Sequence, residues 1–442
     1  MCEATIAITG SHIMTTFPSW LRGEQHITPL TWQNVALAHA YLPLYFFLAY
    51  LTRRPRTHRL RIFLLPVVVA VILRCTLRYR IMEETWGWYN WMRGLLALTL
   101  IAHSIYFASL PEGMLKLSEE PPRICRGSPA ESSVVWSPEK DEGQMVAAPA
   151  PSLTPGGVLR CISDALEVGL LGRGIGWRYS QGLHIPKHRR STERKAFLKS
   201  TSLSVIAVFL LIDLVDSSVE YLPGITATSG TLFLPHLPPI LRYTVSTALT
   251  FVIGMVVILG ISMWYDLMSL IAVGIFHQSP SDWPPFHDEP WKMGSLHEFW
   301  SKRWHQVLRH TFLVMGGYPG RWLGGDVGML FGTFLASGLF HEFGFNLGGA
   351  PFDWKVIAYF AVQPFGLLAE KTYRAYTGRR VSGWLGWCWA AMWVVGLNQM
   401  ASDSWFARGA AGKVLVPPAL SPARRVFIPI ARDMWNTYVQ EH

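Results

Sequence analysis

The composition of this 442-residue chain is that of a membrane protein. Half of its residues are hydrophobic and only 15% are charged, whereas soluble proteins carry about 25% charged residues. The formal net charge is +10, but the basic residues cluster beside apolar runs, where topology and anionic lipid explain them better than nucleic acid does. A soluble enzyme is therefore not expected, and neither is a nucleic-acid partner.

Long apolar runs recur along the chain, and a helix needs about 20 apolar residues to cross a bilayer core. About eight spans are predicted on this basis. We expect them at Val35–Leu51, Ile62–Leu77, Leu95–Leu110, Leu203–Val215, Thr244–Met263 with a continuation open as far as Phe276, Val327–Phe345, Trp354–Ala369 and Trp384–Leu397. No basic region followed by a short apolar core and a cleavage site precedes the first run, so a cleaved signal peptide is not expected.

The five cysteines are scattered and have neither metal-ligand nor redox spacing. They are Cys2, Cys75, Cys125, Cys161 and Cys388. We therefore predict no disulfide framework, no zinc site and no bound metal.

Basic clusters predict how the chain crosses the membrane. One occupies Arg53–Arg61 and the other Lys187–Lys199, and both should be cytoplasmic because Lys and Arg favour that side. The acidic turn around Asp213 and Asp216 is then lumenal, and the span Val327–Phe345 starts on the cytoplasmic side. We expect a multi-pass protein of the endoplasmic reticulum.

Between Pro111 and about Leu159 the chain is rich in Pro, Ser, Glu and Gly. Such a stretch buries too little apolar surface to offset its ordering entropy, so a flexible cytoplasmic linker is predicted. The resulting division is an N-terminal segment 1–34, three spans in 35–110, the linker 111–160, a core 161–400 and a C-terminal segment 401–442.

The stretch from Ser295 to Phe312 has the periodicity of an amphipathic helix. Its apolar face would carry Leu296, Trp300, Trp304, Val307, Leu308 and Phe312, and its polar face Lys302, His305, Gln306, Arg309 and His310. Such a helix suits the membrane interface. Its basic face could also hold the phosphates of a nucleotide-containing thioester donor, and periodicity alone leaves open a plain interfacial anchor.

His341 lies inside the predicted span Val327–Phe345. An ionisable side chain at membrane depth costs on the order of 3 kcal/mol on insertion scales, so it tends to face a protein interior or an aqueous cavity. Imidazole is also the commonest general base near neutral pH, although a histidine here could simply hydrogen-bond across two packed helices. Ser337 and Gly338 lie one turn earlier and could leave room for substrate. Glu342, the next residue, should face elsewhere because neighbours on a helix diverge.

The motifs in these two stretches resemble a known family. Pro285-Phe286, Ser295-Leu296 and Phe299–Gln306, followed by Ser337–Glu342, are similar to the signatures of wax synthase-like enzymes, a branch of the membrane-bound O-acyltransferase superfamily. Arg173–Trp177 also resembles a motif of fungal members. The resemblance covers roughly residues 165 to 400.

This resemblance implies acyl transfer from acyl-CoA, a co-substrate and not a bound cofactor, to a hydrophobic alcohol in the lipid bilayer. Fungal relatives of this type often acetylate terpenoid or meroterpenoid hydroxyls, and plant relatives make wax esters from long acyl chains. By analogy His341 is the catalytic base and Ser337 and Gly338 line the substrate pocket. The acyl-CoA-binding residues would be Trp300, Lys302, Arg303, Trp304, Gln306 and Arg309. His305, a second catalytic candidate, stands where many members have Asn, so its role is not fixed.

The predicted fold is therefore an all-α polytopic membrane helical bundle with a buried reaction chamber and an interfacial amphipathic helix. Two other classes stay open. A transporter would show paired repeats with broken helices, which we do not find. A membrane prenyltransferase would use Asp213 and Asp216 for magnesium diphosphate, but it needs a second acidic cluster that the sequence lacks; the end of a lumenal helix explains these aspartates as well.

Overall fold

The computed structural model describes residues 27–119, 162–163, 165–170, 172–222 and 225–441. Most of the predicted linker, along with Cys2, Cys125 and Cys161, lies outside these residues. The chain divides into two compact units, the first comprising Met1–Ala38, Arg74–Thr99 and Gly182–His442, and the second His39–Leu73 and Leu100–Gln181. Two long helices, α4 (His58–Arg78) and α5 (Gly87–Ser109), pass from one unit to the other.

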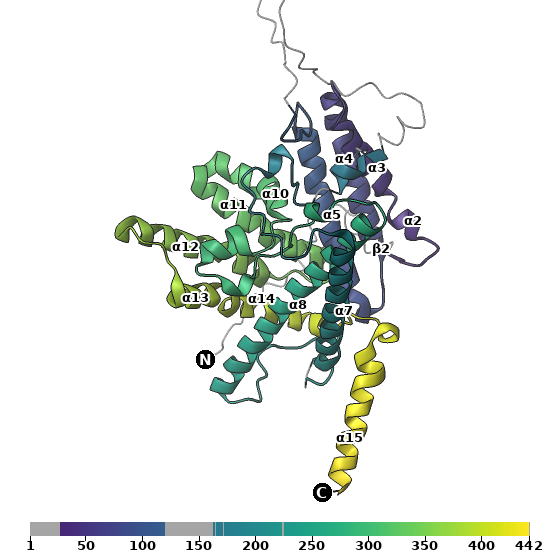
Figure 1. The fold of residues 1–442 in the computed structure, drawn as a ribbon, viewed down its shortest axis with the longest axis vertical. Coiled ribbons are helices and arrows are strands. Elements are labelled where there is room, and N and C mark those ends of the chain that lie inside the picture. The colour runs from purple at the N-terminus through teal and green to yellow at the C-terminus, as the bar shows by residue number, and fades with distance from the viewer. Residues whose placement is uncertain (1–26, 120–161, 164, 171, 223–224, 442) are drawn as a thin grey trace, which may run out of the picture. The chain divides into compact units, whose positions relative to one another are not determined.

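The described residues are mostly helical and contain almost no strand, as predicted. The shorter elements of the N-terminal part are β1 (Thr28–Pro29), α2 (Val35–Ala38), α3 (Tyr41–Leu51) and β2 (Tyr79–Arg80), with β1 and β2 paired in parallel. The later helices are α7 (Arg194–Val219), α8 (Pro239–Gly274), α9 (Leu296–Glu298), α10 (Arg309–Phe312), α11 (Tyr318–Leu347), α12 (Trp354–Thr377), α13 (Gly383–Ala391), α14 (Asn398–Ala407) and α15 (Ile428–Glu441) (Figure 1).

Five helical segments in the described part are long and apolar enough to cross a membrane. They are His58–Arg78, Glu84–Ser109, Arg194–Val219, Pro239–Gly274 and Arg309–Leu347. The membrane-bundle class is confirmed, while the number of eight spans stays a prediction. Helix α8 does continue past Met263, and its 36 residues extend about 54 Å at 1.5 Å per residue, longer than a hydrocarbon core of about 30 Å.

In the second unit, the sequence motif Arg173–Trp177 forms a tight turn. Gly174 and Gly176 both have positive φ (64° and 85°), a conformation that favours glycine. The turn buries Trp177, which is 2% exposed, beneath the cationic groups of Arg53 and Lys116 at 5.2 and 5.5 Å from its ring centroid. The motif therefore has a clear packing role in this unit.

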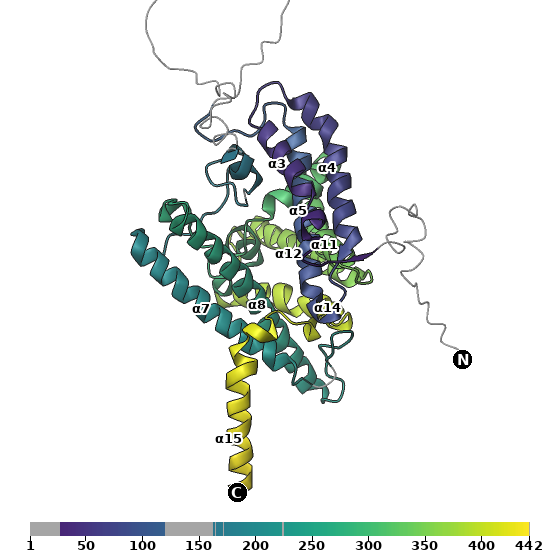
Figure 2. The ribbon, with the colours of Figure 1, turned by 90° about the vertical axis from the view of Figure 1, so that its right-hand side faces the viewer.

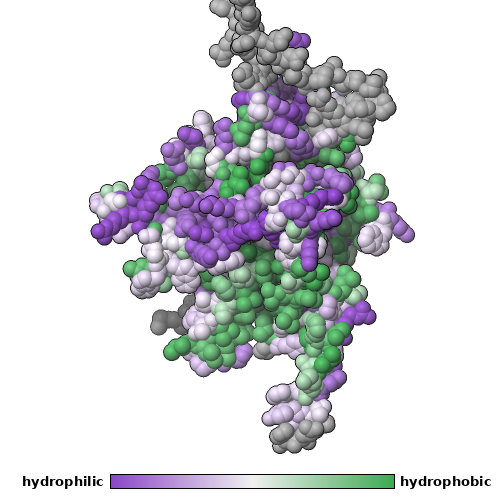
Figure 3. Space-filling view, in the orientation of Figure 1, coloured by the Kyte–Doolittle hydropathy of each residue, from purple (hydrophilic) through white to green (hydrophobic). Residues whose placement is uncertain are grey.

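In the first unit, α7 and α8 run side by side, and α11 packs against α12 (Figures 1 and 2). Apolar side chains of α7 and α8, among them Ile206, Leu210, Phe251 and Val252, are exposed. Hydrophobic residues gather over the lower part of these helices (Figure 3). This surface is suited to lipid contact because a helix exposed to hydrocarbon satisfies its own backbone hydrogen bonds.

The segment Arg309–Leu347 folds back on itself instead of running straight. Helical geometry fails at Gly324 and at Gly325, whose φ is 60°, and the chain reverses there. The glycines of the two arms then meet. A Cβ on Gly316 would overlap the carbonyl oxygen of Gly332, and a Cβ on Gly320 would overlap the carbonyl oxygen of Gly328. Small residues allow this close backbone approach. The hairpin tip is exposed, with Trp322 at 86% and Leu323 at 77%.

The predicted amphipathic helix is wrong in its second half. Helical backbone runs through α9 and a π-turn, Phe299–Arg303, and then stops at Trp304, whose backbone is extended (ψ 159°). It resumes at Arg309. The break is stabilised by Gln306, whose side-chain amide donates to the carbonyl oxygens of Trp300 (3.2 Å) and Trp304 (3.1 Å). These contacts satisfy carbonyl groups that a helix end leaves without partners.

Candidate active site

One large cavity lies in the first unit, with a volume of about 650 Å³, within the range of small-molecule sites. Its walls come from α8, the Pro290–Phe312 segment, α11, α12 and the α13–α14 region. On α11 the lining residues share one helical face, which runs from Asp326 at the hairpin tip through Thr333 to His341. Fifteen residues of helix separate the two ends, about 22 Å. The cavity is therefore long enough for two substrates to meet end to end.

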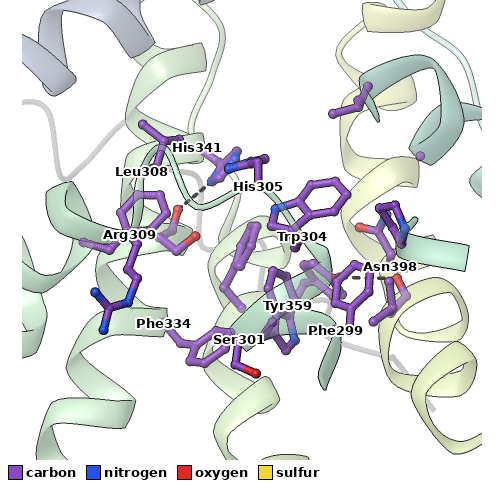
Figure 4. A pocket seen from close by; sticks show the side chains of 18 of the residues that line it. Phe299, Ser301, Trp304, His305, Leu308, Arg309, Phe334, His341, Tyr359 and Asn398 are labelled. Atoms are coloured by element: carbon purple, nitrogen blue, oxygen red, sulfur yellow. Dashed lines mark hydrogen bonds between the residues drawn. The ribbon is translucent and has the colours of Figure 1, made fainter. Parts of the chain in front are cut away.

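His341 faces this cavity with a defined tautomer (Figure 4). Its Nδ1 lies 2.7 Å from the backbone carbonyl oxygen of Ser337. A carbonyl only accepts, so Nδ1 carries the proton and Nε2 keeps a lone pair. The ring is held by a stacked contact with Phe360. The two ring centroids are 4.7 Å apart and the angle between the ring planes is 16°. His341 is therefore oriented to accept a proton through Nε2.

Glu342 takes no part in this arrangement. Its carboxylate is fully buried and binds the guanidinium of Arg408 through two hydrogen bonds, 2.8 and 3.1 Å long. It also accepts from the backbone N–H of Asp353 at 2.7 Å. This ion pair ties the end of α11 to α14, in agreement with the expectation that no His341–Glu342 dyad forms.

The extended stretch after the π-turn brings Trp304 and His305 to the cavity wall. The rings of Trp304 and His305 are in contact, with their centroids 4.9 Å apart. The ring centroid of His287 lies 6.0 Å from that of His305. Nδ1 of His305 is buried without a hydrogen-bond partner among the described residues. Burial, and then the neighbouring His287 and His341, hold the pKa of His305 well below its usual value. This imidazole is accordingly neutral near pH 7.

The predicted acyl-CoA-binding residues separate into two groups. Trp300, Trp304, Gln306 and Arg309 line the cavity, whereas Lys302 and Arg303 are not among its lining residues. The Arg303 guanidinium binds Glu298 at 2.7 Å and the carbonyl oxygen of Asp288 at 2.9 Å, so it braces the Pro284–Arg303 loop. Arg309 is exposed and makes no ion pair within the described part of the chain.

The two predicted pocket residues also differ. Ser337 lines the cavity, but Gly338 does not. A Cβ on Gly338 would stand 2.9 Å from the Cα of Ile357, so this glycine permits close packing of α11 on α12. The space beside His341 therefore does not come from Gly338.

Sequence reasoning missed several lining residues, including Tyr359 and Phe360 on α12 and Asn398 on α14. Their helices were predicted from hydropathy, which does not reveal which face points inward. A π-turn at Met392–Gly396 changes the helical phase just before Asn398, and such turns are frequent at functional sites. No residue in the sequence marks this turn.

The acidic residues considered for prenyl transfer have structural partners. Asp216 accepts from the backbone N–H groups of Leu415 and Val416 and pairs with Arg424 at 3.2 Å. Asp213 accepts from the N–H of Ala423 at 2.7 Å. Both carboxylates anchor the C-terminal segment to α7. Within the residues that the structure describes, no group of three or more His, Cys, Asp or Glu could hold a metal ion.

Comparisons with known proteins find a family match over the segment that holds the two histidines, and several fungal relatives. Residues 283–363 match the Membrane bound O-acyl transferase family. The chain is similar to O-Mevalon transferase yanI of Aspergillus niger, at 29% identity over 33% of this chain and 34% of the relative. It is also similar to acetyltransferase ple2 of Rhodocybe pseudopiperita, at 23% identity over 60% and 70% of the two chains. Acetyltransferase eriL of Hericium erinaceus is 23% identical over 56% of this chain and 68% of the relative.

The chain thus spans about a third of the first relative and about two thirds or more of the other two. No solved structure matches it. The matched family and the fungal acetyltransferases confirm the resemblance that the Phe299–Gln306 and Ser337–Glu342 motifs indicated. Residues 283–363, which match the membrane bound O-acyl transferase family, carry both His305 and His341.

Proposed function

We propose that this protein transfers an acyl group, namely acetyl, from acyl-CoA to a hydroxyl of a hydrophobic acceptor of the terpenoid or meroterpenoid class. The observation that carries the proposal is that His341, the imidazole of His305 and the cation of Arg309 line the same cavity, with Nδ1 of His341 bound to the Ser337 carbonyl oxygen. A base, a neutral hydrogen-bond donor and an anion-binding group are the parts that this reaction requires.

The proposed step is direct transfer. The acceptor hydroxyl gives its proton to Nε2 of His341 while its oxygen attacks the thioester carbonyl carbon. The tetrahedral intermediate then collapses, the C–S bond breaks, and the coenzyme A sulfur leaves with the proton returned by the imidazolium. General base assistance of this kind is worth about 10² to 10⁴ in rate.

His305 is suited to stabilise the oxygen that becomes negative in that step. Its ring is neutral because of burial, and a neutral imidazole carries one N–H donor. Its Nδ1 has no protein partner within the described residues, so a group on the substrate can supply one. Donors aimed at a developing oxyanion commonly contribute 10² to 10³ in rate, roughly.

The donor is expected to bind with its phosphates at Arg309 and its acyl end at His341. Trp300 and Trp304 offer apolar surface on the wall of the same cavity, and Trp300 is fixed by a hydrogen bond from its indole N–H to Gln363 (3.2 Å) and by edge contact with Phe334. The acceptor would occupy the more apolar end. For the whole chain we propose a multi-pass protein of the endoplasmic reticulum.

The test is transfer of labelled acetyl from acetyl-CoA to a panel of hydroxylated terpenoids, with membranes containing the full chain. We expect ester formation by the wild-type protein and its loss in His341→Ala. His277→Ala, which alters an exposed histidine after α8, serves as the matched control. Parallel reactions with palmitoyl-CoA and a fatty alcohol separate acetyl transfer from wax-ester synthesis. Uptake of the alcohol without conversion, or retention of full activity by His341→Ala, would reject the proposal.

A further inference from the structure

Several polar groups on the cavity wall are not used by the proposed reaction, and Asn398 is one of them. The helical stretch from α13 to α14 lines the cavity with Val394, Val395, Asn398, Ala401 and Trp405. These positions follow helical spacing and form one stripe. Among these five residues only Asn398 has a side-chain amide, which can both donate and accept a hydrogen bond.

The Asn398 amide makes no hydrogen bond within the described part of the chain. Two other polar side chains on the cavity wall are occupied: Thr250 donates to the carbonyl oxygen of Ser246 (2.8 Å), and Tyr359 donates to that of Val394 (3.2 Å). The Ser301 hydroxyl and the Trp405 indole N–H also have no hydrogen-bond partner within the described residues, but neither is an amide that presents both a donor and an acceptor. The neighbouring amide, Gln399, is bound to Ser246 and Thr247 of α8. Two adjacent amides thus have different roles, because one joins helices and the other faces the cavity.

Asn398 lies away from the reacting groups. Figure 4 shows it on the far side of Trp304 from His305 and His341, with Arg309 also on the histidine side. The part of the cavity wall that α8 contributes is mostly apolar and includes Phe251, Ile253 and Val257. The donor phosphates need the cation at the other end, so the molecule that reaches Asn398 is the acceptor.

We propose that Asn398 hydrogen-bonds a second oxygen of the acceptor, which is then a hydrophobic alcohol with a carbonyl or hydroxyl group remote from the hydroxyl that reacts. This inference rests on the proposed function and deepens it. A ligand without that oxygen would cover the amide and leave it unsatisfied, which carries a penalty that a bonded ligand avoids. Asn398 is in this sense a specificity residue and not a catalytic one.

The experiment measures kcat/KM for two alcohols of one carbon skeleton, a keto-alcohol or diol and the mono-alcohol that lacks the remote oxygen. The full chain in membranes is assayed with acetyl-CoA. The wild-type protein should prefer the oxygenated partner by about tenfold, the worth of one hydrogen bond of about 1.4 kcal/mol. Asn398→Leu, of similar size and without polar atoms, should bring the ratio close to one while turnover of the mono-alcohol is retained.

Two further variants keep the test decisive if Asn398→Leu folds poorly. Asn398→Asp keeps the shape but loses the N–H donor, so preference for the keto-alcohol should disappear while that for the diol remains. Gln399→Leu removes the adjacent amide and its contacts with α8, and should lower thermal stability without changing the ratio.

An unchanged ratio in the Asn398 variants, alongside normal transfer, overturns this inference alone. A rise in KM for acetyl-CoA that is equal with both alcohols also overturns it, because the amide would then bind the donor. If the wild-type protein acylates no alcohol at all, the proposed function fails and this inference fails with it.

Discussion

His341 and Glu342 are adjacent in the chain, yet their side chains serve different ends: the imidazole faces the cavity, while the carboxylate is buried against Arg408 at 2.8 Å. One residue belongs to the proposed chemistry and the other to the joint between α11 and α14. Their substitutions should therefore have separable effects.

We predict that His341→Gln abolishes acyl transfer by a factor of about 10² or more while the protein keeps its thermal stability in detergent. Glu342→Gln should do the reverse. It removes one partner of a buried ion pair, which costs about 3–5 kcal/mol, but the folded fraction should retain its turnover rate. Thermal unfolding and activity normalised to folded protein would distinguish the two. Equal loss of activity per folded molecule in both variants would contradict the division of roles.

Arg309 and Lys302 provide a matched pair of cations, one on the cavity wall and one away from it. We predict that Arg309→Ala raises KM for acyl-CoA about tenfold, the effect of losing one charged hydrogen bond of roughly 1.5 kcal/mol, with little change in kcat. Arg309→Lys should recover part of the loss because it keeps the charge. Lys302→Ala should leave KM unchanged. A larger effect at Lys302 than at Arg309 would place the donor phosphates outside this cavity.

Hydropathy predicted the helices well because membrane spans must be continuous and apolar, and the residues of Ile62–Leu77 and Leu203–Val215 lie wholly inside α4 and α7. Periodicity failed at Trp304, where a buried Gln306 amide compensates for the broken helix. The reversal at Gly324–Gly325 was visible in principle, because Gly316 and Gly320 mirror Gly332 and Gly328 about that point. The position of Asn398 on the cavity wall could not be predicted, because no sequence pattern marks the π-turn before it.

The depressed pKa of His305 predicts how stability depends on pH. In the unfolded chain this ring takes up a proton near pH 6.5, whereas in the folded protein burial, His287 and His341 keep it neutral to lower pH. The unfolded state therefore binds more protons below pH 6.5, and the folded protein loses up to about 1.4 kcal/mol per pH unit on acidification. The loss stops once pH falls below the folded pKa.

His305→Gln should remove this contribution. We predict that the fall in melting temperature between pH 7.5 and pH 5 is smaller in this variant than in the wild-type protein, both measured in the same detergent. His277→Ala, at an exposed position, should behave as wild type. Parallel pH profiles for wild type and His305→Gln would show that the His305 ring is charged in the folded protein.

The glycine contacts of the Arg309–Leu347 hairpin lead to the last prediction. A Cβ on Gly320 would overlap the carbonyl oxygen of Gly328, a backbone atom that cannot move without separating the two arms. Gly320→Ala should therefore destabilise the protein, by about 1–3 kcal/mol for an overpacked contact, and should shift Arg309 relative to His341. Gly260→Ala in α8 is the control, because its nearest neighbour there is Ile212 at 4.0 Å, and alanine favours a helix by up to about 1 kcal/mol. Melting temperatures of the two variants should move in opposite directions. If Gly320→Ala were as stable as Gly260→Ala, the arms could not be packed as closely as the structure has them.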